Sequence, residues 1–426
     1  MAKHTEDKFE ETIEKQMLAK DWKKRQPKDF DRQRCILPND VLDFILATQP
    51  KEFEKLENMQ PGEAREGLLH RISQEVNNRG TISVLRKGIE HLGCKFDVCY
   101  FPPSSGLNEE SRRLFEANIL SVVRQLKFSQ KNEKSIDMVL FVNGLPIFTA
   151  ELKNPMTGQD FYDAVVQYRN DRNPKGEPFL QFGRCLAHFA VDPNIVQVTT
   201  KLEGKKSFFI PFNKGFDHGA GNPPSLTSYS TSYLWNDIWN RTTTLKLLQH
   251  FLHHQPTTGK ASRGKRGGLG KLIFPRYHQL DATRRLVADS QQSGAGKNYL
   301  VQHSAGSGKS NTIAWLSHRL SILHGTDDKR VFDAIIILSD RRVLDKQLRD
   351  TVRAFEQTRG VVAAIEGTSA QLKEALENRK QIIVTTLQKF PQIVNAVEEM
   401  SDRKFALVID EAHSSQGGEQ AQAVSR

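Results

Sequence analysis

Apolar residues at helical spacing predict two amphipathic helices in the first third of the chain. One pattern covers residues 7–19 and the other covers residues 110–126. Further on, two strand-like apolar runs within residues 136–153 flank the pair Asn143-Gly144. An Asn-Gly pair between two such runs is a strong signal for a β-hairpin, because both residues tolerate the left-handed backbone of a tight turn.

The second half of the chain has a different pattern, in which short apolar runs alternate with helical stretches. The runs are residues 299–302, 334–338, 381–385 and 405–409. Continuous runs rich in β-branched residues are typical of strands that are buried on both faces of a parallel sheet. We therefore predict an α/β fold with a parallel sheet in this half.

Two stretches interrupt these patterns. Residues 213–230 are rich in Gly, Pro and Ser and predict an irregular loop. Residues 255–271 combine glycines with five basic residues, a composition that cannot form a core, so we expect a flexible linker. The predicted organisation is a first domain at 1–254, the linker at 255–271 and a second domain at 272–426. The charge of the linker could contact phosphates, but a solvated linker is the simpler interpretation.

Composition narrows the class of protein. A chain of 426 residues can form two or three domains, and 38% hydrophobic residues argues against wholesale disorder. No apolar run approaches the roughly 20 residues that span a bilayer, and the charged N-terminus is unlike a signal peptide, so we expect a cytoplasmic protein. Four cysteines without a CxxC pair argue against a disulfide scaffold or a zinc site. The net charge of +11 favours a polyanionic partner, although an ordinary basic protein would show the same balance.

A glycine-rich loop follows the apolar run 299–302. It reads His303-Ser-Ala-Gly-Ser-Gly-Lys-Ser310 and precedes a helical stretch, which is the order of elements that binds nucleotide phosphates. Lys309 can reach the β- and γ-phosphates, and the Ser310 hydroxyl can bind Mg²⁺. The usual pattern has glycine where His303 stands, and a Gly/Ser turn with a chance lysine is the alternative. The residues expected to bind ATP here are Gly306, Ser307, Gly308, Lys309 and Ser310.

Two further segments complete the predicted nucleotide site. The apolar run 405–409 ends in Asp410 and Glu411, which a buried strand would bring to the edge where ligands bind. Asp410 can hold Mg²⁺ and Glu411 can activate the attacking water, with His413 placed to sense the nucleotide. Before the loop, Gln279 offers an amide that suits the edge of adenine, although an exposed helix start would look the same.

The predicted hairpin carries a different chemistry at one end. Asp137 begins its first strand, and Glu151 and Lys153 end its second strand. Two carboxylates can bind Mg²⁺ so that the metal activates water, and a lysine can stabilise the nucleophile or the transition state of phosphodiester hydrolysis. An ordinary hairpin with a salt bridge at its rim is the alternative.

Strand register decides whether these groups can meet. A two-residue turn followed by a regular ladder would place Asp137 opposite Ala150, with Glu151 on the other face. One extra residue is needed, in a bulge or in the connection, and Pro146 is the expected place because it cannot donate to the ladder. We predict a three-residue loop that pairs Val142 with Pro146 and sets Asp137 opposite Glu151.

These motifs resemble two known families. Gln279, residues 303–310 and residues 410–413 resemble the adenine-reading motif, motif I and motif II of superfamily 2 helicases and translocases. Asp137 with Glu151-Leu152-Lys153 resembles the PD-(D/E)xK nuclease core in the restriction (R) subunit of type I restriction-modification enzymes, as do flanking strings such as QYRNDRNP and FGRCLAHFAVD. The resemblance covers most of residues 95–426. It implies a restriction-endonuclease-like domain with a mixed sheet, followed by the beginning of a RecA-like helicase domain.

The resemblance also implies cofactors, partners and further residues. Members of the family cut double-stranded DNA with Mg²⁺ and use ATP to pump DNA toward a methyltransferase (M) and specificity (S) core. We therefore expect DNA and the M and S subunits as partners. By analogy with the nuclease core, Glu11 or Glu14 would lie near the metal. The implied DNA contacts are Gln167, Tyr168, Arg341 and Arg342.

The chain ends at Arg426, 13 residues past His413, and encodes no second RecA-like domain. The strand that follows motif II in this fold would be missing, leaving an internal gap in the sheet beside the phosphate-loop strand. We therefore expect a fragment or truncated product that can bind ATP but cannot translocate alone. Two alternatives stay open: a non-catalytic fragment that docks on DNA or the methyltransferase, and a DNA-repair nuclease-helicase without a methyltransferase partner.

Overall fold

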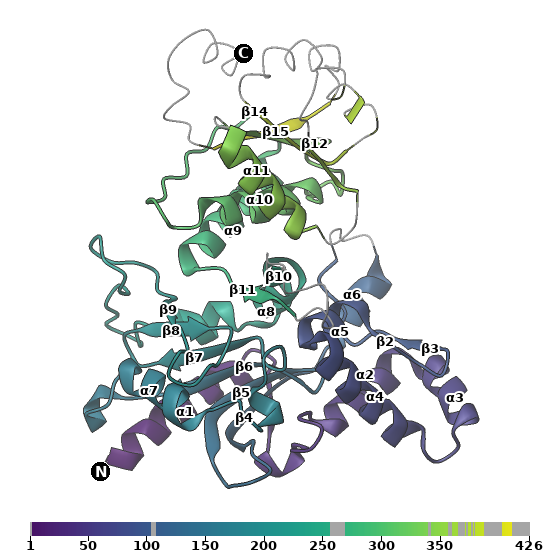
Figure 1. Cartoon of the computed structure of the whole chain (residues 1–426), viewed down its shortest axis with the longest axis vertical. Helices are drawn as coiled ribbons and strands as arrows, with labels where there is room; N and C mark the ends of the chain where they lie inside the picture. The colour runs from purple at the N-terminus through teal and green to yellow at the C-terminus, as the bar shows by residue number, and fades with distance from the viewer. Residues whose placement is uncertain are drawn as a thin grey trace. The chain divides into compact units, whose positions relative to one another are not determined.

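The structure is a computed structural model that describes residues 2–103, 108–255, 269–339, 342–356, 360–364, 371, 374–375, 378, 380–386 and 403–410. It forms two compact units, which divide between Tyr277 and His278 (Figure 1). Strand β11 (Lys271–Ile273) pairs with β10 (His253–Gln255) in the first unit. The first unit therefore reaches a few residues beyond the boundary that composition predicts.

A mixed seven-stranded sheet forms the centre of the first unit. Its strand order is β1-β4-β5-β6-β7-β8-β9. The pairs β1–β4 and β6–β7 are parallel, and the other neighbours are antiparallel. This arrangement confirms the predicted mixed α/β class. The bounds are β1 (Lys23–Arg25), β4 (Leu120–Lys127), β5 (Ser135–Val142), β6 (Leu145–Leu152), β7 (Ala187–Val191), β8 (Val196–Thr199) and β9 (Ile210–Pro211).

Two helices pack against this sheet and matter for the site. Helix α1 (Ala2–Leu18) contacts β1 and β6, and helix α7 (Phe161–Asp171) contacts β6, β7 and β8. Phe9, Ile13 and Met17 of α1 are fully buried, which confirms the helical spacing read from residues 7–19. Burial of these three apolar side chains stabilises the packing of α1 against β6, the strand that carries Glu151.

The predicted helix at 110–126 is only partly correct. Helix α6 (Glu109–Glu116) ends before Asn118, whose side-chain amide donates to the backbone oxygens of Tyr100 and Phe115. The chain then enters β4, which pairs with β1 on one side and β5 on the other. Ile119 to Leu126 is rich in β-branched residues, and pairing on both sides overrides the helical spacing.

The remaining elements of the first unit surround this sheet. A group of helices and a short hairpin lies between β1 and β4 in sequence and gathers beside the sheet (Figure 1). It comprises α2 (Pro38–Thr48), α3 (Pro50–Met59), α4 (Ala64–Arg79), α5 (Thr81–Lys87), β2 (Ile89–His91) and β3 (Cys94–Phe96). Residues 213–230 form the irregular loop that was predicted. The short helices are η1 (Pro27–Asp29), η2 (Pro155–Thr157), η3 (Pro178–Leu180), the π-helical η4 (Leu234–Ile238) and η5 (Leu247–Phe251), and α8 (Arg241–Lys246).

Within the described residues, a four-stranded parallel sheet forms the centre of the second unit. Its order is β13-β14-β12-β15, with bounds β13 (Val362–Ala364), β14 (Ile382–Thr386), β12 (Ala334–Ser339) and β15 (Phe405–Ile409). The helices are α9 (Tyr277–Ser293), α10 (Lys309–Ser321) and α11 (Arg342–Ala354). Helix α10 packs on β12, β14 and β15. The parallel sheet and three of its four predicted strands are confirmed.

The prediction of a strand at residues 299–302 is wrong. These residues have no regular secondary structure, and Leu300 is 84% exposed. An apolar run forms a strand only when a neighbour accepts and donates its backbone hydrogen bonds, and none of the described strands pairs with this one. Among the residues that the structure describes, no helix has the length and apolar character needed to cross a bilayer.

Candidate active site on the β5–β6 hairpin and candidate nucleotide site

The hairpin turn differs from the predicted one. Asn143 and Gly144 both have positive φ (48° and 79°), and Val142 pairs with Leu145, so the connection has two residues rather than three. The extra residue lies instead in a bulge: Phe141 pairs with Pro146 and Leu140 with Phe148, which leaves Ile147 without a partner residue. The predicted loop is therefore wrong. The Asn-Gly pair favours the tight turn, and the ladder breaks beside the proline that cannot donate to it.

The bulge produces the predicted shift in register. Beyond it, Met138 pairs with Ala150, and continuing the same register places Asp137 opposite Glu151. Asp137 Oδ2 accepts a hydrogen bond from the Leu152 backbone N–H at 2.8 Å, so its carboxylate lies against the end of β6. The two strands thus bring both carboxylates to one place.

Glu151 is fully buried, and only one of its two carboxylate oxygens accepts a hydrogen bond from the described residues. Its Oε1 accepts a hydrogen bond from Arg172 Nε at 2.6 Å, whereas its Oε2 is buried and accepts none from the described residues. Burial and the neighbouring charge of Asp137 raise the pKa of Glu151, and Arg172 acts in the opposite direction. A divalent cation would relieve both the repulsion and the unsatisfied oxygen.

Lys153 lies two residues further along the same edge. Its Nζ is 2.9 Å from Glu6 Oε1 of helix α1. Burial alone would lower the pKa of Lys153, but the bond to Glu6 and the charges of Asp137 and Glu151 raise it overall. The ammonium group therefore stays charged beside the two carboxylates.

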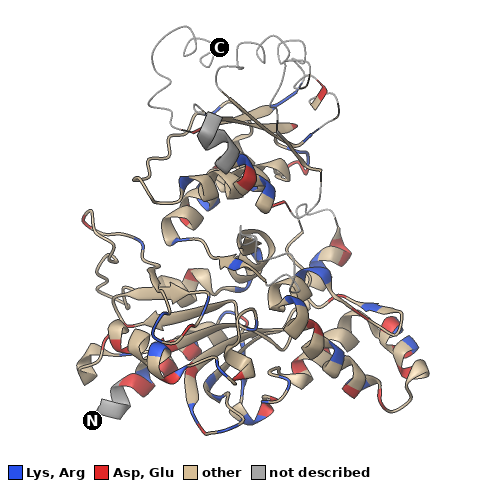
Figure 2. Ribbon diagram, in the orientation of Figure 1, with Lys and Arg blue, Asp and Glu red and all other residues tan. Residues whose placement is uncertain are grey.

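Helix α1 contributes an acid that the sequence prediction missed. Glu10 is 1% exposed, and burial together with the charge of Asp137 raises the pKa of its carboxyl to about 7. Of the two residues expected near the metal, Glu11 is exposed, whereas Glu14 is buried and pairs with Lys24 at 2.8 Å, so the expectation for Glu14 stays a prediction. The signal was present in the spacing, because Glu6, Glu10 and Glu14 recur every four residues along one face. Figure 2 shows the acidic residues gathered along α1.

Of the four residues expected to contact DNA, the structure describes the side chains of two, Gln167 and Tyr168. Tyr168 is fully buried, with its hydroxyl 2.8 Å from Thr149 Oγ1, so the expectation that it touches DNA is wrong. The reason is that α7 packs on the sheet and Tyr168 lies on its inner face. Gln167 is half-buried on the same helix. Arg341 and the side chain of Arg342 lie outside the described residues.

The hairpin site fits a cation that is held by few protein ligands. Among the residues described, no group of three or more His, Cys, Asp or Glu is gathered as a metal site. Mg²⁺ is usually held by one or two carboxylates and keeps several waters, so a larger group is not required. Asp137 and the free oxygen of Glu151 are suitable donors of this kind.

The phosphate loop has the backbone that was predicted. Gly306 and Gly308 have φ of 74° and 85°, in the left-handed region that favours glycine, and Lys309 begins helix α10. The loop therefore leads directly into the N-terminus of α10, whose dipole favours an anion. Ser307 is buried within the loop, and Ser310 follows Lys309 in the first turn of α10.

Gln279 contacts the phosphate loop directly. Its side chain is buried, and its Nε2 donates to the backbone oxygens of Ser307 at 3.1 Å and Gly308 at 3.0 Å. The amide nitrogen therefore holds the phosphate loop, and the adenine contact expected of Gln279 stays a prediction. Asp410 follows β15 directly, and its N–H donates to Leu338 O at 2.9 Å. Glu411 and His413 lie outside the described residues.

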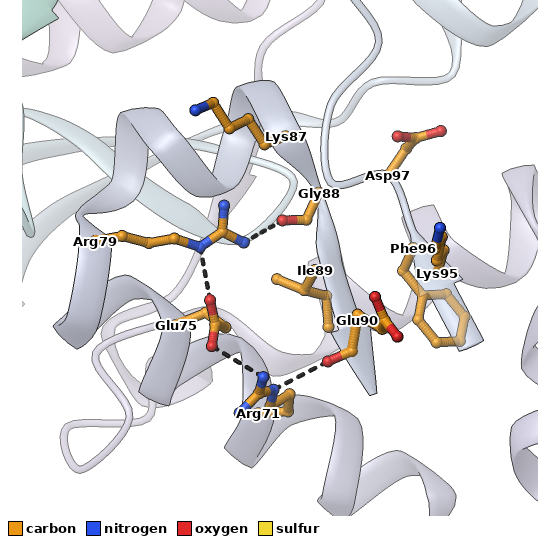
Figure 3. Close-up of a pocket in the computed structure, with 10 residues that line it drawn as sticks. All are labelled: Arg71, Glu75, Arg79, Lys87, Gly88, Ile89, Glu90, Lys95, Phe96 and Asp97. Carbon is orange, nitrogen blue, oxygen red and sulfur yellow. Dashed lines mark hydrogen bonds and ion pairs between the residues drawn. The ribbon is translucent and has the colours of Figure 1, made fainter. Parts of the chain in front are cut away.

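A polar pocket of about 400 Å³ lies in the group of helices before β4, and no residue of the β5–β6 hairpin lines it (Figure 3). Its Arg71 and Arg79 both pair with Glu75, at 3.1 Å and 2.6 Å. Arg71 also donates to Glu90 O, and Arg79 to Gly88 O. These contacts stabilise the helices and hold both guanidinium groups in place.

Comparison with known proteins agrees with this architecture. The family described as type I restriction enzyme R protein N terminus matches residues 10–207, which include the whole hairpin site. The SWI2/SNF2 ATPase family matches residues 278–426, the second unit. The chain belongs to the R proteins of type I restriction enzymes.

Relatives of this R protein come from bacteria and archaea. The type I restriction enzyme SauCOLORF180P endonuclease subunit of Staphylococcus aureus (strain COL) is 25% identical over 319 residues, covering 72% of this chain and 30% of its own length. The type I restriction enzyme HindI endonuclease subunit of Haemophilus influenzae is 26% identical over 317 residues, covering 71% and 28%. A sequence from Methanocaldococcus jannaschii is 24% identical over 333 residues, covering 71% and 30%. This R protein chain thus spans about 30% of the length of its relatives.

Proposed function

We propose that this R protein chain joins an Mg²⁺-dependent endonuclease for double-stranded DNA to the first domain of an ATP-driven DNA translocase. The bulge at Ile147 is the observation that carries the nuclease proposal, because it sets Asp137 opposite Glu151 beside Lys153. A regular hairpin with this turn would have separated the carboxylates onto two faces.

The nuclease residues have distinct proposed roles. Asp137 and Glu151 Oε2 hold the cation, which supplies an activated water and neutralises charge on the phosphate. Lys153 stabilises the attacking oxygen once a DNA phosphate takes the place of Glu6, its present partner at 2.9 Å. Glu10, whose pKa of about 7 lies near working pH, can accept a proton at this site.

The motor residues follow the same logic. Gly306, Gly308 and Lys309 bind the ATP phosphates at the N-terminus of α10, and Ser310 with Asp410 holds the Mg²⁺ that accompanies them. We propose that Glu411 activates the attacking water and that His413 senses the nucleotide, as their positions after β15 suggest.

The proposed partners are double-stranded DNA and the M and S subunits. The names of the relatives describe them as endonuclease subunits of type I restriction enzymes. The match to R proteins favours this function over a DNA-repair nuclease-helicase. The close approach of Asp137 and Glu151 beside Lys153 favours it over a fragment without catalysis.

Substitutions in a full-length R subunit that contains these residues, assembled with M and S subunits, test both activities. Asp137→Ala and Lys153→Ala are expected to reduce cleavage of a supercoiled plasmid at least about 100-fold. Lys309→Ala is expected to abolish ATP-dependent translocation. Glu11→Gln, an exposed acid on the same helix as Glu10, serves as the control and should cleave normally. Undiminished cleavage by Asp137→Ala would refute the nuclease, and translocation by Lys309→Ala would refute the motor.

A further inference from the structure

We propose that Arg172 is a positioning residue, which orients the Glu151 carboxylate so that one of its oxygens is presented to a divalent cation. The inference rests on the proposed metal-dependent nuclease and adds to it a residue that does not itself touch cation or DNA. Arg172 lies directly after helix α7, far from the hairpin in sequence.

The Arg172 side chain is fixed by contacts to separate parts of the sheet. Its Nε donates to Glu151 Oε1 at 2.6 Å, and its second terminal nitrogen (Nη2) donates to the Ser135 backbone oxygen at 2.6 Å. The guanidinium also lies over the Phe128 ring, 5.7 Å from its centroid. With 5% of its side chain exposed, Arg172 has little freedom to move.

These contacts determine which oxygen of Glu151 is available. Arg172 donates to Glu151 Oε1 and also to the backbone oxygen of Ser135. Ser135 is the first residue of β5, the strand that carries Asp137, so Arg172 links Glu151 to that strand. The carboxylate therefore cannot exchange its two oxygens by rotation without breaking this bond. Oε2 is left buried without a hydrogen-bond donor among the described residues.

A purely structural ion pair would have a different geometry. Arginine and carboxylate in a buried pair commonly form two parallel hydrogen bonds, which satisfy both oxygens. Here the guanidinium donates its second hydrogen bond to the Ser135 backbone oxygen, so Glu151 Oε2 accepts none from the described residues. A buried, unsatisfied carboxylate oxygen is costly, and a cation held between Glu151 and Asp137 would satisfy it.

Binding of Mn²⁺ to the 426-residue chain, followed by electron paramagnetic resonance of the free ion, tests the proposal without any cleavage reaction. Arg172→Gln is expected to weaken binding at the site by about 10- to 100-fold, as loss of a residue that orients a ligand does. Arg172→Lys keeps the charge but not the two fixed donors and should fall between wild type and Arg172→Gln. The control is Arg169→Gln in the last turn of α7, because Arg169 donates only to the Ser207 backbone oxygen among its described hydrogen bonds.

The same measurement in a Glu151→Gln variant separates a positioning role of Arg172 from a general loss of structure. If Arg172 acts through Glu151, adding Arg172→Gln to Glu151→Gln should not weaken Mn²⁺ binding further. Wild-type affinity in both Arg172 variants would overturn the proposal, as would an equal loss in Arg169→Gln. If Arg172→Gln does not fold, judged by near-ultraviolet circular dichroism, the lysine variant alone decides. Absence of any Mn²⁺ site sensitive to Asp137→Asn would instead refute the metal-dependent nuclease, and this inference with it.

Discussion

Replacing Gly144 by alanine should destabilise the first unit strongly, because this glycine closes the hairpin that carries the nuclease residues. Its φ is +79°, and a Cβ atom there would lie 2.5 Å from Leu37 O, 2.5 Å from Val41 Cγ2 and 3.0 Å from Val41 N. Two of these neighbours are backbone atoms at the start of α2, which cannot move aside as a flexible side chain could. The Gly144 backbone oxygen also accepts a hydrogen bond from Leu37 N at 2.8 Å.

The cost has two parts that can be estimated separately. A side chain in the left-handed region costs about 1–2 kcal/mol. Moving the turn away from α2 would also sacrifice the hydrogen bond from Leu37, worth about 1 kcal/mol, and disturb its packing. Gly144→Ala should therefore lower the free energy of unfolding by about 3 kcal/mol.

Gly158 provides a matched control for this estimate. It has the same φ of +79°, but a Cβ atom there would meet nothing within 4 Å. Gly158→Ala should lower the free energy of unfolding by only about 1 kcal/mol, the cost of the backbone conformation alone. Urea unfolding followed by tryptophan fluorescence measures both variants. Equal losses in the two variants would refute the close packing of the turn against α2.

Three further predictions concern charge and the nucleotide site. Burial raises the pKa of Glu10 to about 7, so the folded state keeps a proton that the unfolded state loses near pH 4.5. With chelator present, the free energy of unfolding should therefore fall by on the order of 2 kcal/mol as the pH rises between these values. Glu10→Gln should remove this fall, as measured by urea titration at each pH. Lys309→Ala should abolish binding of a fluorescent ATP analogue, whereas Asp137→Asn should not affect it. Gln279→Ala removes the side-chain amide that donates to the Ser307 and Gly308 backbone oxygens and should weaken ATP binding about tenfold by the same assay, and unchanged affinity would contradict the loop contact.

The hairpin could be predicted because its signals are local. Asn143-Gly144 specifies a tight turn, and the spacing of Asp137 and Glu151 requires one extra residue between them. The sequence alone could not show that this residue is Ile147 in a bulge. The packing of Gly144 against Leu37 and Val41, which are distant in sequence, was also beyond what local signals show.

The errors share one physical cause, since each concerns a segment whose state depends on a distant partner. Strand β4 (Leu120–Lys127) forms because β1 and β5 pair with it, although the spacing of residues 110–126 also suits a helix. Residues 299–302 have strand-like composition but no described neighbour to pair with. Arg172 meets Glu151 only through the packing of α7, and no motif in the sequence marks this contact.

The central claim is that Asp137 and Glu151 share a divalent cation, and a crystal structure of the chain with Mn²⁺ tests it most directly. The anomalous signal should place an ion about 2.1 Å from a carboxylate oxygen of Asp137 and from Oε2 of Glu151, with Oε1 still bound to Arg172. An ion bound elsewhere with these two carboxylates empty, or the two side chains on opposite faces of the sheet, would contradict the account.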